Sequence, residues 1–174
     1  MNKLLIILLS LFLFSCTNYD CDDLEYRNGF QYEKMTEHLA NGHYKCIENR
    51  NSGGGNSEHV TDCHYKDGLG IGKWTYEAQG QLIHNGEYLD YPDLKALLKS
   101  KTKAKIIEIE AWYEGSYGAL NIRIFSPEIS LDSLSSLSII ENYTMKICSE
   151  YKLQEIKFSQ KINNDWSTRT FQVK

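Results

Sequence analysis

The chain has 174 residues, with 19 basic and 23 acidic side chains and a formal net charge of −4. This balance disfavours nucleic acid as a partner, because phosphates are bound by a basic stripe that the sequence does not show. In chain order, the first segment is apolar from Leu4 to Phe14, broken only by Ser10 and preceded by Lys3. About eleven apolar residues are too few to cross a bilayer of roughly 30 Å as a helix, so residues 1–15 are predicted to be a signal peptide.

The end of this segment, Leu13-Phe14-Ser15-Cys16, resembles the box of a bacterial lipoprotein, in which a small residue precedes the lipidated cysteine. The resemblance implies lipidation of Cys16, a tether over residues 16–24, and a place in the outer membrane facing the periplasm or the cell surface. Several acyl chains anchor a protein stably, whereas one does so only marginally. The alternative is a plain signal peptide in which Cys16 has no role. Acidic residues in the tether resemble the surface-export tags of Bacteroidetes lipoproteins, or simply keep it solvated: Asp20, Asp22 and Asp23.

Four more cysteines follow in a compartment where disulfides persist: Cys21, Cys46, Cys63 and Cys148. Cys46 and Cys63 flank a loop rich in Asn, Ser and Gly, as two neighbouring strands would. A disulfide between them would stabilise the fold by about 3 kcal/mol on a chain-entropy estimate. Cys148 lies in a helical apolar pattern, which predicts a packed core thiol.

Histidines and cysteines gather in the stretch that holds His43, Cys46, His59, Cys63 and His64. Zinc sites favour paired ligands two to four residues apart. The two cysteines lack such close partners, and Cys63 and His64 would point to opposite faces of one strand. We therefore predict no metal site and no cofactor.

The stretch Asp67-Gly-Leu-Gly-Ile-Gly-Lys73 looks at first like a phosphate-binding loop. A P-loop needs glycine where Asp67 stands and Ser or Thr where Trp74 stands, and a dinucleotide fingerprint needs glycine at Lys73. The glycines are better explained by tight turns between short strands, because glycine enters positive φ without penalty. The expected turns are Asp67-Gly68, the Gln79-Gly80-Gln81 region and Asn85-Gly86, with Trp74–Tyr76 and Leu82–His84 as the strands between.

The same stretch resembles one unit of the MORN-like repeats of bacterial YwqK-family antitoxin proteins, through Asp67-Gly68, Gly72, Trp74, Tyr76, Gly80, Leu82 and Tyr88. Tyr26–Gly29 and Asn41–Tyr44 look like eroded fragments of further units, separated by an irregular insert from Asn49 to Ser57. The resemblance implies an antiparallel meander of β-hairpins over residues 25–90 and a toxin-neutralising role, and it brings no catalytic residues.

Residues 91–174 are predicted to form a separate α+β module. A short helix is expected over Asp93–Lys101, followed by a strand over Lys105–Tyr113 with Ile107, Ile109 and Ala111 on one face. A turn at Glu114–Gly118 leads to a partner strand with Leu120, Ile122 and Ile124 on one face. A helix capped by Asp132 or Ser130 follows, with apolar positions Leu134, Leu137, Ile140, Tyr143, Ile147, Cys148 and Tyr151. Strands over Gln154–Ile162 and Trp166–Val173 then complete a four-stranded antiparallel sheet with one long helix packed on a face.

The other face of this sheet would carry Glu108, Glu110 and Trp112, with Arg123 beside them. Aromatic and arginine side chains concentrate at interface hot spots, so this face is a possible partner-binding surface. The alternative is an ordinary solvated sheet face.

Catalysis is disfavoured because the nearest candidates for a nucleophile and a base, Asp62, Cys63 and His64, are adjacent on one strand, which works against mutual contact. The sequence therefore predicts an envelope-anchored lipoprotein that acts as a non-catalytic protein-binding module, including an immunity or antitoxin-like role. The alternative is a structural or assembly lipoprotein of a cell-surface complex, and a hydrolase is the less favoured third reading.

Overall fold

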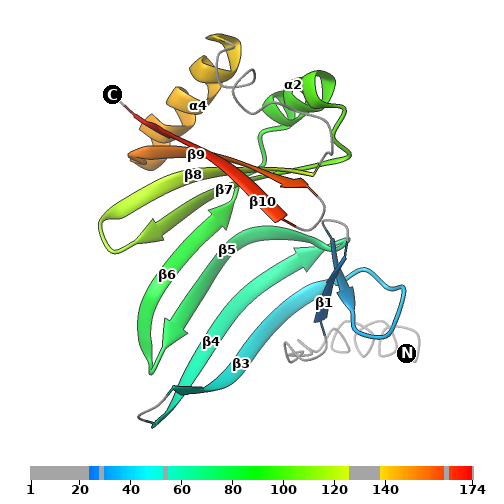
Figure 1. Cartoon of the computed structure of the whole chain (residues 1–174), viewed down its shortest axis with the longest axis vertical. Coiled ribbons are helices and arrows are strands. Elements are labelled where there is room, and N and C mark those ends of the chain that lie inside the picture. The colour runs from blue at the N-terminus through cyan, green and yellow to red at the C-terminus, as the bar shows by residue number, and fades with distance from the viewer. Residues whose placement is uncertain (1–23, 28–29, 53–54, 126–137, 163–164, 174) are drawn as a thin grey trace, which may run out of the picture.

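The protein is described by a computed structural model over residues 24–27, 30–52, 55–125, 138–162 and 165–173. These residues form an α+β fold in which a large sheet carries two helices (Figure 1). Its strands are β1 (Leu24–Arg27), β2 (Phe30–Glu33), β3 (Gly42–Ser52), β4 (Gly55–Lys66), β5 (Leu69–Ala78), β6 (Gln81–Tyr88), β7 (Ile106–Glu114), β8 (Tyr117–Phe125), β9 (Glu155–Ile162) and β10 (Asp165–Gln172). The helices are α2 (Pro92–Thr102) and α4 (Ser138–Tyr151).

One eight-stranded sheet has the order β10-β9-β8-β7-β6-β5-β4-β3, and β1 and β2 form a separate hairpin. The predicted strands of both halves therefore belong to a single sheet, joined where β6 pairs with β7 and Gly86 lies opposite Trp112. All neighbours are antiparallel except β8 and β9, which are parallel, so an antiparallel sheet over the second half was the wrong prediction. A helix lies between these two strands in the chain, and a helical crossover returns the chain to the same end of the sheet.

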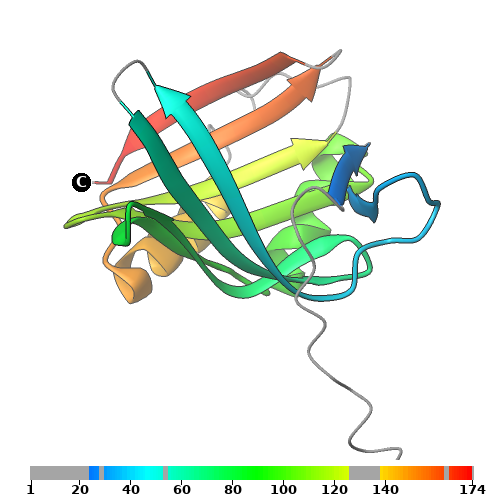
Figure 2. The same cartoon turned by 90° about the horizontal axis from the view of Figure 1, so that it is seen from below.

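The sheet is strongly curved, with α2 and α4 on its outer, convex side (Figures 1 and 2). Alternating side chains of β7 and β8 point outward into the main core and inward onto the concave face. The outward set pairs across the two strands as Ile107 with Ile124, Ile109 with Ile122 and Ala111 with Leu120, as their alternation predicts. We call these two sides the outer face and the inner face.

The helices close the main core with the apolar positions that their sequences predict. Buried residues are Leu94 and Leu98 from α2, and Ile140, Ile147 and Cys148 from α4. Pro92 stands in the first turn of α2, where its missing N–H costs no hydrogen bond. The predicted caps Ser130 and Asp132 lie outside the described residues.

Two of the three predicted glycine turns are present. Asp67-Gly68 has φ values of 50° and 75°, and Gln79-Gly80 has φ values of 54° and 73°. Two successive residues in the left-handed region of φ are typical of the tight turns of β-hairpins. The third prediction was wrong, because Gly86 lies inside β6. A Cβ on Gly86 would come within 2.6 Å of the Trp74 indole Nε1 and of the Ala111 carbonyl oxygen. Glycine is needed there for close packing and not for a turn.

The β3–β4 hairpin also differs from its prediction. In the described part of the predicted irregular insert, residues 49–52 and 55–57, the strands are regular, since Asn49 pairs with Glu58 and Arg50 with Ser57 in the ladder.

The predicted Cys46–Cys63 disulfide was wrong. Cys63 is a free, buried thiol, whereas Cys46 is disulfide-bonded, and not to Cys63. Cys46 lies opposite Thr61 and Cys63 opposite Tyr44, so the two cysteines are diagonal neighbours. Diagonal residues lie about 7–8 Å apart, beyond the usual span of a disulfide.

A smaller buried cluster, Ala40, Tyr44 and Cys63, lies at the other end of the sheet, with Leu24, Tyr65 and Trp74 packed against it. The β1–β2 hairpin reaches this end through a hydrogen bond from the Gln31 N–H to the Gly68 carbonyl, 2.8 Å long. Neither described helix is long and apolar enough to cross a bilayer. Cys16, Cys21 and the whole predicted signal peptide and lipid anchor lie outside the described residues.

Candidate functional site

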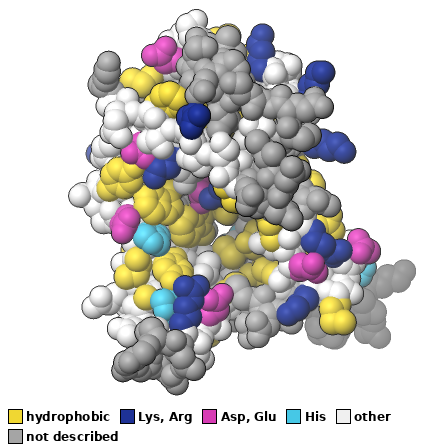
Figure 3. Space-filling view, in the orientation of Figure 1, with side chains coloured by type: hydrophobic (Ala, Val, Ile, Leu, Met, Phe, Trp, Pro, Cys, Tyr) yellow, Lys and Arg dark blue, Asp and Glu magenta, His cyan; other side chains and the backbone are white. Residues whose placement is uncertain are grey.

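The inner face of the sheet is hollowed. Figure 3 shows hydrophobic side chains gathered around a hollow in the middle of that view, with charged and histidine side chains at its border. Two groups of side chains on this face are distinct in chemistry, a row of aromatic rings and a half-buried arginine with two carboxylates.

The aromatic row consists of one ring from each of five successive strands, β4 to β8. Its members are His59, Tyr76, His84, Trp112 and Tyr117, all half-buried. Neighbouring ring centroids are 5.7, 5.6, 5.2 and 5.9 Å apart along the row, within the 4.5–7 Å at which aromatic pairs attract one another. The row is therefore a continuous, ordered band that crosses the sheet at right angles to its strands.

A lysine from the next strand, β9, extends the row. The Lys157 Nζ lies 5.3 Å from the Trp112 ring centroid and 5.6 Å from that of Tyr117, close enough for cation–π attraction. Its ammonium also pairs with the Glu155 carboxylate at 3.1 Å. Partial burial opposes the charge on Lys157, but the hydrogen bond and charge of Glu155 outweigh it and raise the lysine pKa. The row thus ends in a positive charge at every physiological pH.

The second group centres on Arg123 of β8. Its Nη2 donates to the Glu110 carboxylate at 2.5 Å and its Nη1 to the Glu108 carboxylate at 3.3 Å. The Glu110 carboxylate also accepts a 3.3 Å hydrogen bond from the Asn121 amide. The Glu110 side chain is 2% exposed and that of Glu108 13%. These partners form a charge network on the inner face in which Glu110 is buried and Arg123 and Glu108 are half-buried.

The pKa values in this network follow from burial and from the neighbouring charges. Burial disfavours the charged form of Arg123, but the attraction of Glu110 and Glu108 outweighs it and raises the arginine pKa. Burial likewise raises the pKa of Glu108, against the opposing effect of Arg123. Burial also raises the pKa of Tyr65 and of Tyr88, so both phenols stay neutral.

A pocket of about 190 Å³ opens beside Arg123, lined by Tyr26, Tyr65, Tyr88, Glu108, Arg123 and Trp166 among others. The Tyr26 ring reaches it from β1, with its centroid 6.2 Å from that of Phe125. Phe125 in turn contacts Trp166 of β10 at 5.5 Å. The pocket is therefore built from both ends of the chain.

The residues predicted as a partner-binding surface share the inner face, as their alternation indicates: Glu108, Glu110, Trp112 and Arg123. The face is less open than predicted, because Glu110 is only 1% exposed and serves to hold Arg123. Only Trp112 of the four belongs to the aromatic row. Alternation in each strand places the other row members on one side, but no local pattern reveals the strand order that brings them into line.

Of the three residues weighed for catalysis, the structure brings Asp62 and His64 to one face of β4 and turns Cys63 to the other. Cys63 points into the protein and His64 outward, as strand geometry predicts. Burial raises the pKa of the Cys63 thiol, which keeps it protonated and a poor nucleophile. Within the aromatic row, two hydrogen bonds hold the His59 ring. Its Nε2 is 2.9 Å from the Ser57 hydroxyl and its Nδ1 is 2.5 Å from the Tyr76 hydroxyl. This chain of hydrogen bonds fixes the ring of His59 within the aromatic row.

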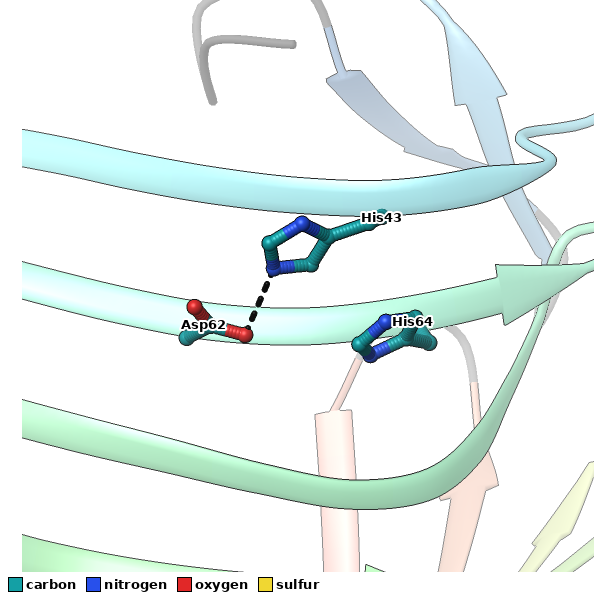
Figure 4. Close-up of side chains that lie close together, drawn as sticks. All are labelled: His43, Asp62 and His64. Carbon is teal, nitrogen blue, oxygen red and sulfur yellow. Dashed lines mark hydrogen bonds and ion pairs between the residues drawn. The ribbon is translucent and has the colours of Figure 1, made fainter. Parts of the chain in front are cut away.

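A separate cluster lies on the outer face of β3 and β4 (Figure 4). Tyr44 and Cys63 point inward, so their neighbours His43, Asp62 and His64 point outward. The His43 Nε2 is 2.8 Å from the Asp62 Oδ1. The rings of His43 and His64, which are direct partners in the ladder, stack with their centroids 4.5 Å apart.

No family model, curated protein or solved structure matches this chain. Its role therefore has to follow from the geometry of its own two faces.

Proposed function

We propose that the chain is a non-catalytic binding module that holds an extended segment of a partner protein on the aromatic row. The observation that supports this is the row itself, five half-buried rings in contact across five strands of a concave face. A row of rings at a spacing of 5–6 Å offers apolar area to a bound chain at successive positions along its length.

Physical chemistry favours a protein partner on this surface. Tyrosine and tryptophan bury large areas with few rotatable bonds, and they dominate the energetic centres of protein interfaces. The rings of the aromatic row already contact one another, so little conformational entropy remains to be lost on binding. Lys157 adds a partly desolvated charge at one end of the row. Because the two ends of the row then differ, the bound segment has a preferred direction.

The cellular setting is part of the same proposal. The box ending at Cys16 supports lipidation and tethering at the bacterial envelope, and the MORN-like stretch supports an immunity or antitoxin-like role within the binding class. Neighbouring genes discriminate between the two versions. A toxin-like reading frame beside this gene favours immunity, whereas an operon for envelope assembly favours a structural role in a cell-surface complex.

The experiment compares affinity capture from envelope extracts by the wild-type protein, Trp112→Ala/Tyr117→Ala and Ile139→Ala. Ile139 is an exposed apolar residue of α4, 50% exposed and away from the row. We expect one protein to be recovered equally by the wild type and Ile139→Ala and to be lost by the double variant. A single hot-spot aromatic residue contributes about 2 kcal/mol or more, which is about 30-fold in Kd, so the affinity of the purified double variant for the captured protein should fall by at least that factor.

The proposal fails if the double variant recovers the same proteins in the same amounts as the wild type. A circular dichroism spectrum and a thermal transition like those of the wild type would show that the loss, where seen, comes from the surface and not from unfolding.

A further inference from the structure

The outer-face cluster of His43, Asp62 and His64 brings three metal-ligand side chains to one point of the sheet. One donor atom from each residue, an imidazole nitrogen or a carboxylate oxygen, lies within 4.8 Å of the other two. We propose that these three residues bind a divalent transition-metal cation of the zinc class. The proposal is independent of the partner-binding role, because the cluster lies on the opposite face of the sheet.

The backbone places the three donors firmly. His43 and His64 are direct partners in the β3–β4 ladder, and Asp62 is two residues before His64 on the same strand face. Adjacent positions on one face of an antiparallel pair are about 4.5–5.5 Å apart at Cβ. The β3–β4 ladder runs without interruption through the cluster, whereas β4 has a register shift against β5 between Asp62 and His64. Because the β3–β4 ladder holds His43, Asp62 and His64 in register, side-chain rotations are enough to bring the donor atoms together.

The remaining movement is small. Zinc bonds to nitrogen and oxygen are about 2.0–2.2 Å long, so donors in a tetrahedral site lie about 3.3 Å apart. The donors here start no more than 4.8 Å apart, and the His43 and Asp62 atoms start at 2.8 Å. The cation would replace this single hydrogen bond with three coordinate bonds.

Exposure of the cluster leaves room for entry and for further ligands. The side chain of His43 is 26% exposed and that of Asp62 39%, and His64 is exposed. Three protein ligands of this kind leave one or more coordination positions to water. Lys45 lies opposite Asp62 in the ladder, but it is exposed, so its flexible ammonium can withdraw into solvent.

The donor set also selects among cations. Imidazole nitrogen suits Zn²⁺, Cu²⁺ and Ni²⁺, whereas Mg²⁺ and Ca²⁺ prefer oxygen ligands alone. Cys46 and Cys63, which stood in the sequence beside these histidines, take no part. Cys46 is disulfide-bonded and Cys63 is turned to the inner face. The site therefore depends on Asp62 in place of a cysteine.

The test titrates Zn²⁺ into the metal-free full chain in mild detergent by isothermal calorimetry, with Mg²⁺ as a second probe. We expect one Zn²⁺ per chain and no Mg²⁺ binding. His64→Gln and Asp62→Asn should each raise the Kd for Zn²⁺ at least about tenfold, since even the loss of an outer partner of a metal ligand costs 10–100-fold. The matched control is His38→Gln, because His38 also faces a carboxylate, that of Glu33 at 3.7 Å, but has no second histidine.

A measurement on the wild-type protein tests the same site without relying on variants that could misfold. In nuclear magnetic resonance spectra, Zn²⁺ should shift or broaden the ring signals of His43 and His64 and leave those of His59 and His84 unchanged. Equal Zn²⁺ affinity in the wild type and His64→Gln, or Zn²⁺ effects confined to other histidines, would overturn the proposal.

Discussion

Replacing Arg123 by methionine tests the charge network of the inner face. The change leaves two carboxylates without their cation, one of them the Glu110 side chain, which is 2% exposed. Removing one partner of a buried ion pair costs about 3–5 kcal/mol, because the remaining charge stays buried and uncompensated. For a chain of this size, each kcal/mol lowers the melting temperature by about 2–4 °C, so we expect a fall of about 6–20 °C at pH 7.

The same substitution has a pH signature whose sign follows from Glu108. Burial already raises the pKa of Glu108, and Arg123 is the group that holds it down. Without Arg123 this pKa rises further, so the folded variant binds a proton that the unfolded chain has lost. Its stability then decreases as the pH rises from the unfolded pKa of about 4.3 to the raised folded value. The deficit relative to wild type should therefore be largest at neutral pH and smaller near pH 4.5.

Thermal and urea unfolding at pH 4.5 and pH 7 measure this effect. Arg123→Met/Glu110→Gln should recover part of the loss, since one of the two stranded charges is gone. The control is Arg50→Met, which breaks the 2.8 Å pair with Glu48 on the surface, where both side chains are more than half exposed. We expect no measurable change there. A loss below about 1 kcal/mol in Arg123→Met, or one that is the same at both pH values, would refute the reasoning.

Two further outcomes are expected. Gly86→Ala should lower the free energy of unfolding by about 1–3 kcal/mol and shift the fluorescence of Trp74, whose indole lies 2.6 Å from the added Cβ, whereas an unchanged spectrum and stability would mean that the ring moves freely. Cys148 should resist thiol reagents at pH 8 until the protein unfolds, because it is 1% exposed and burial raises its pKa to about 11. Mass spectrometry after brief alkylation checks this, and rapid labelling of the folded protein at Cys148 would contradict it.

Local patterns predicted the elements better than their assembly. Alternation in residues 105–113 and the helical spacing from Ile140 to Cys148 identify the core positions, because burial of one face is a local property. Asp67-Gly68 and Gln79-Gly80 were identifiable as turns from their residue types. Gly86 was not, since a glycine required by the Trp74 ring looks the same in sequence as a glycine required by positive φ.

Longer-range features had no local signal. The parallel pairing of β8 with β9 depends on which end of the sheet the chain returns to after α4. The ladder register decides that Cys46 meets Thr61 and not Cys63. The same register brings His43 to His64, and Asp62 joins them only through strand alternation. Weighing carboxylates together with histidines at i and i+2 spacing would have identified Asp62 and His64 as a pair on one face.

The parallel joint between β8 and β9 has a consequence for the order of folding. The hairpins from β4 to β6 and from β7 to β8 are joined by tight turns and can form early, because their contacts are local. Pairing β9 with β8 requires closure of the long segment between them, which carries a larger entropic cost. Lys157 can therefore reach Trp112 and Tyr117 only when this last pairing forms. Until that pairing forms, the core side chains of β8 also lack their cover from β9, which makes the partly folded chain vulnerable to aggregation at that stage.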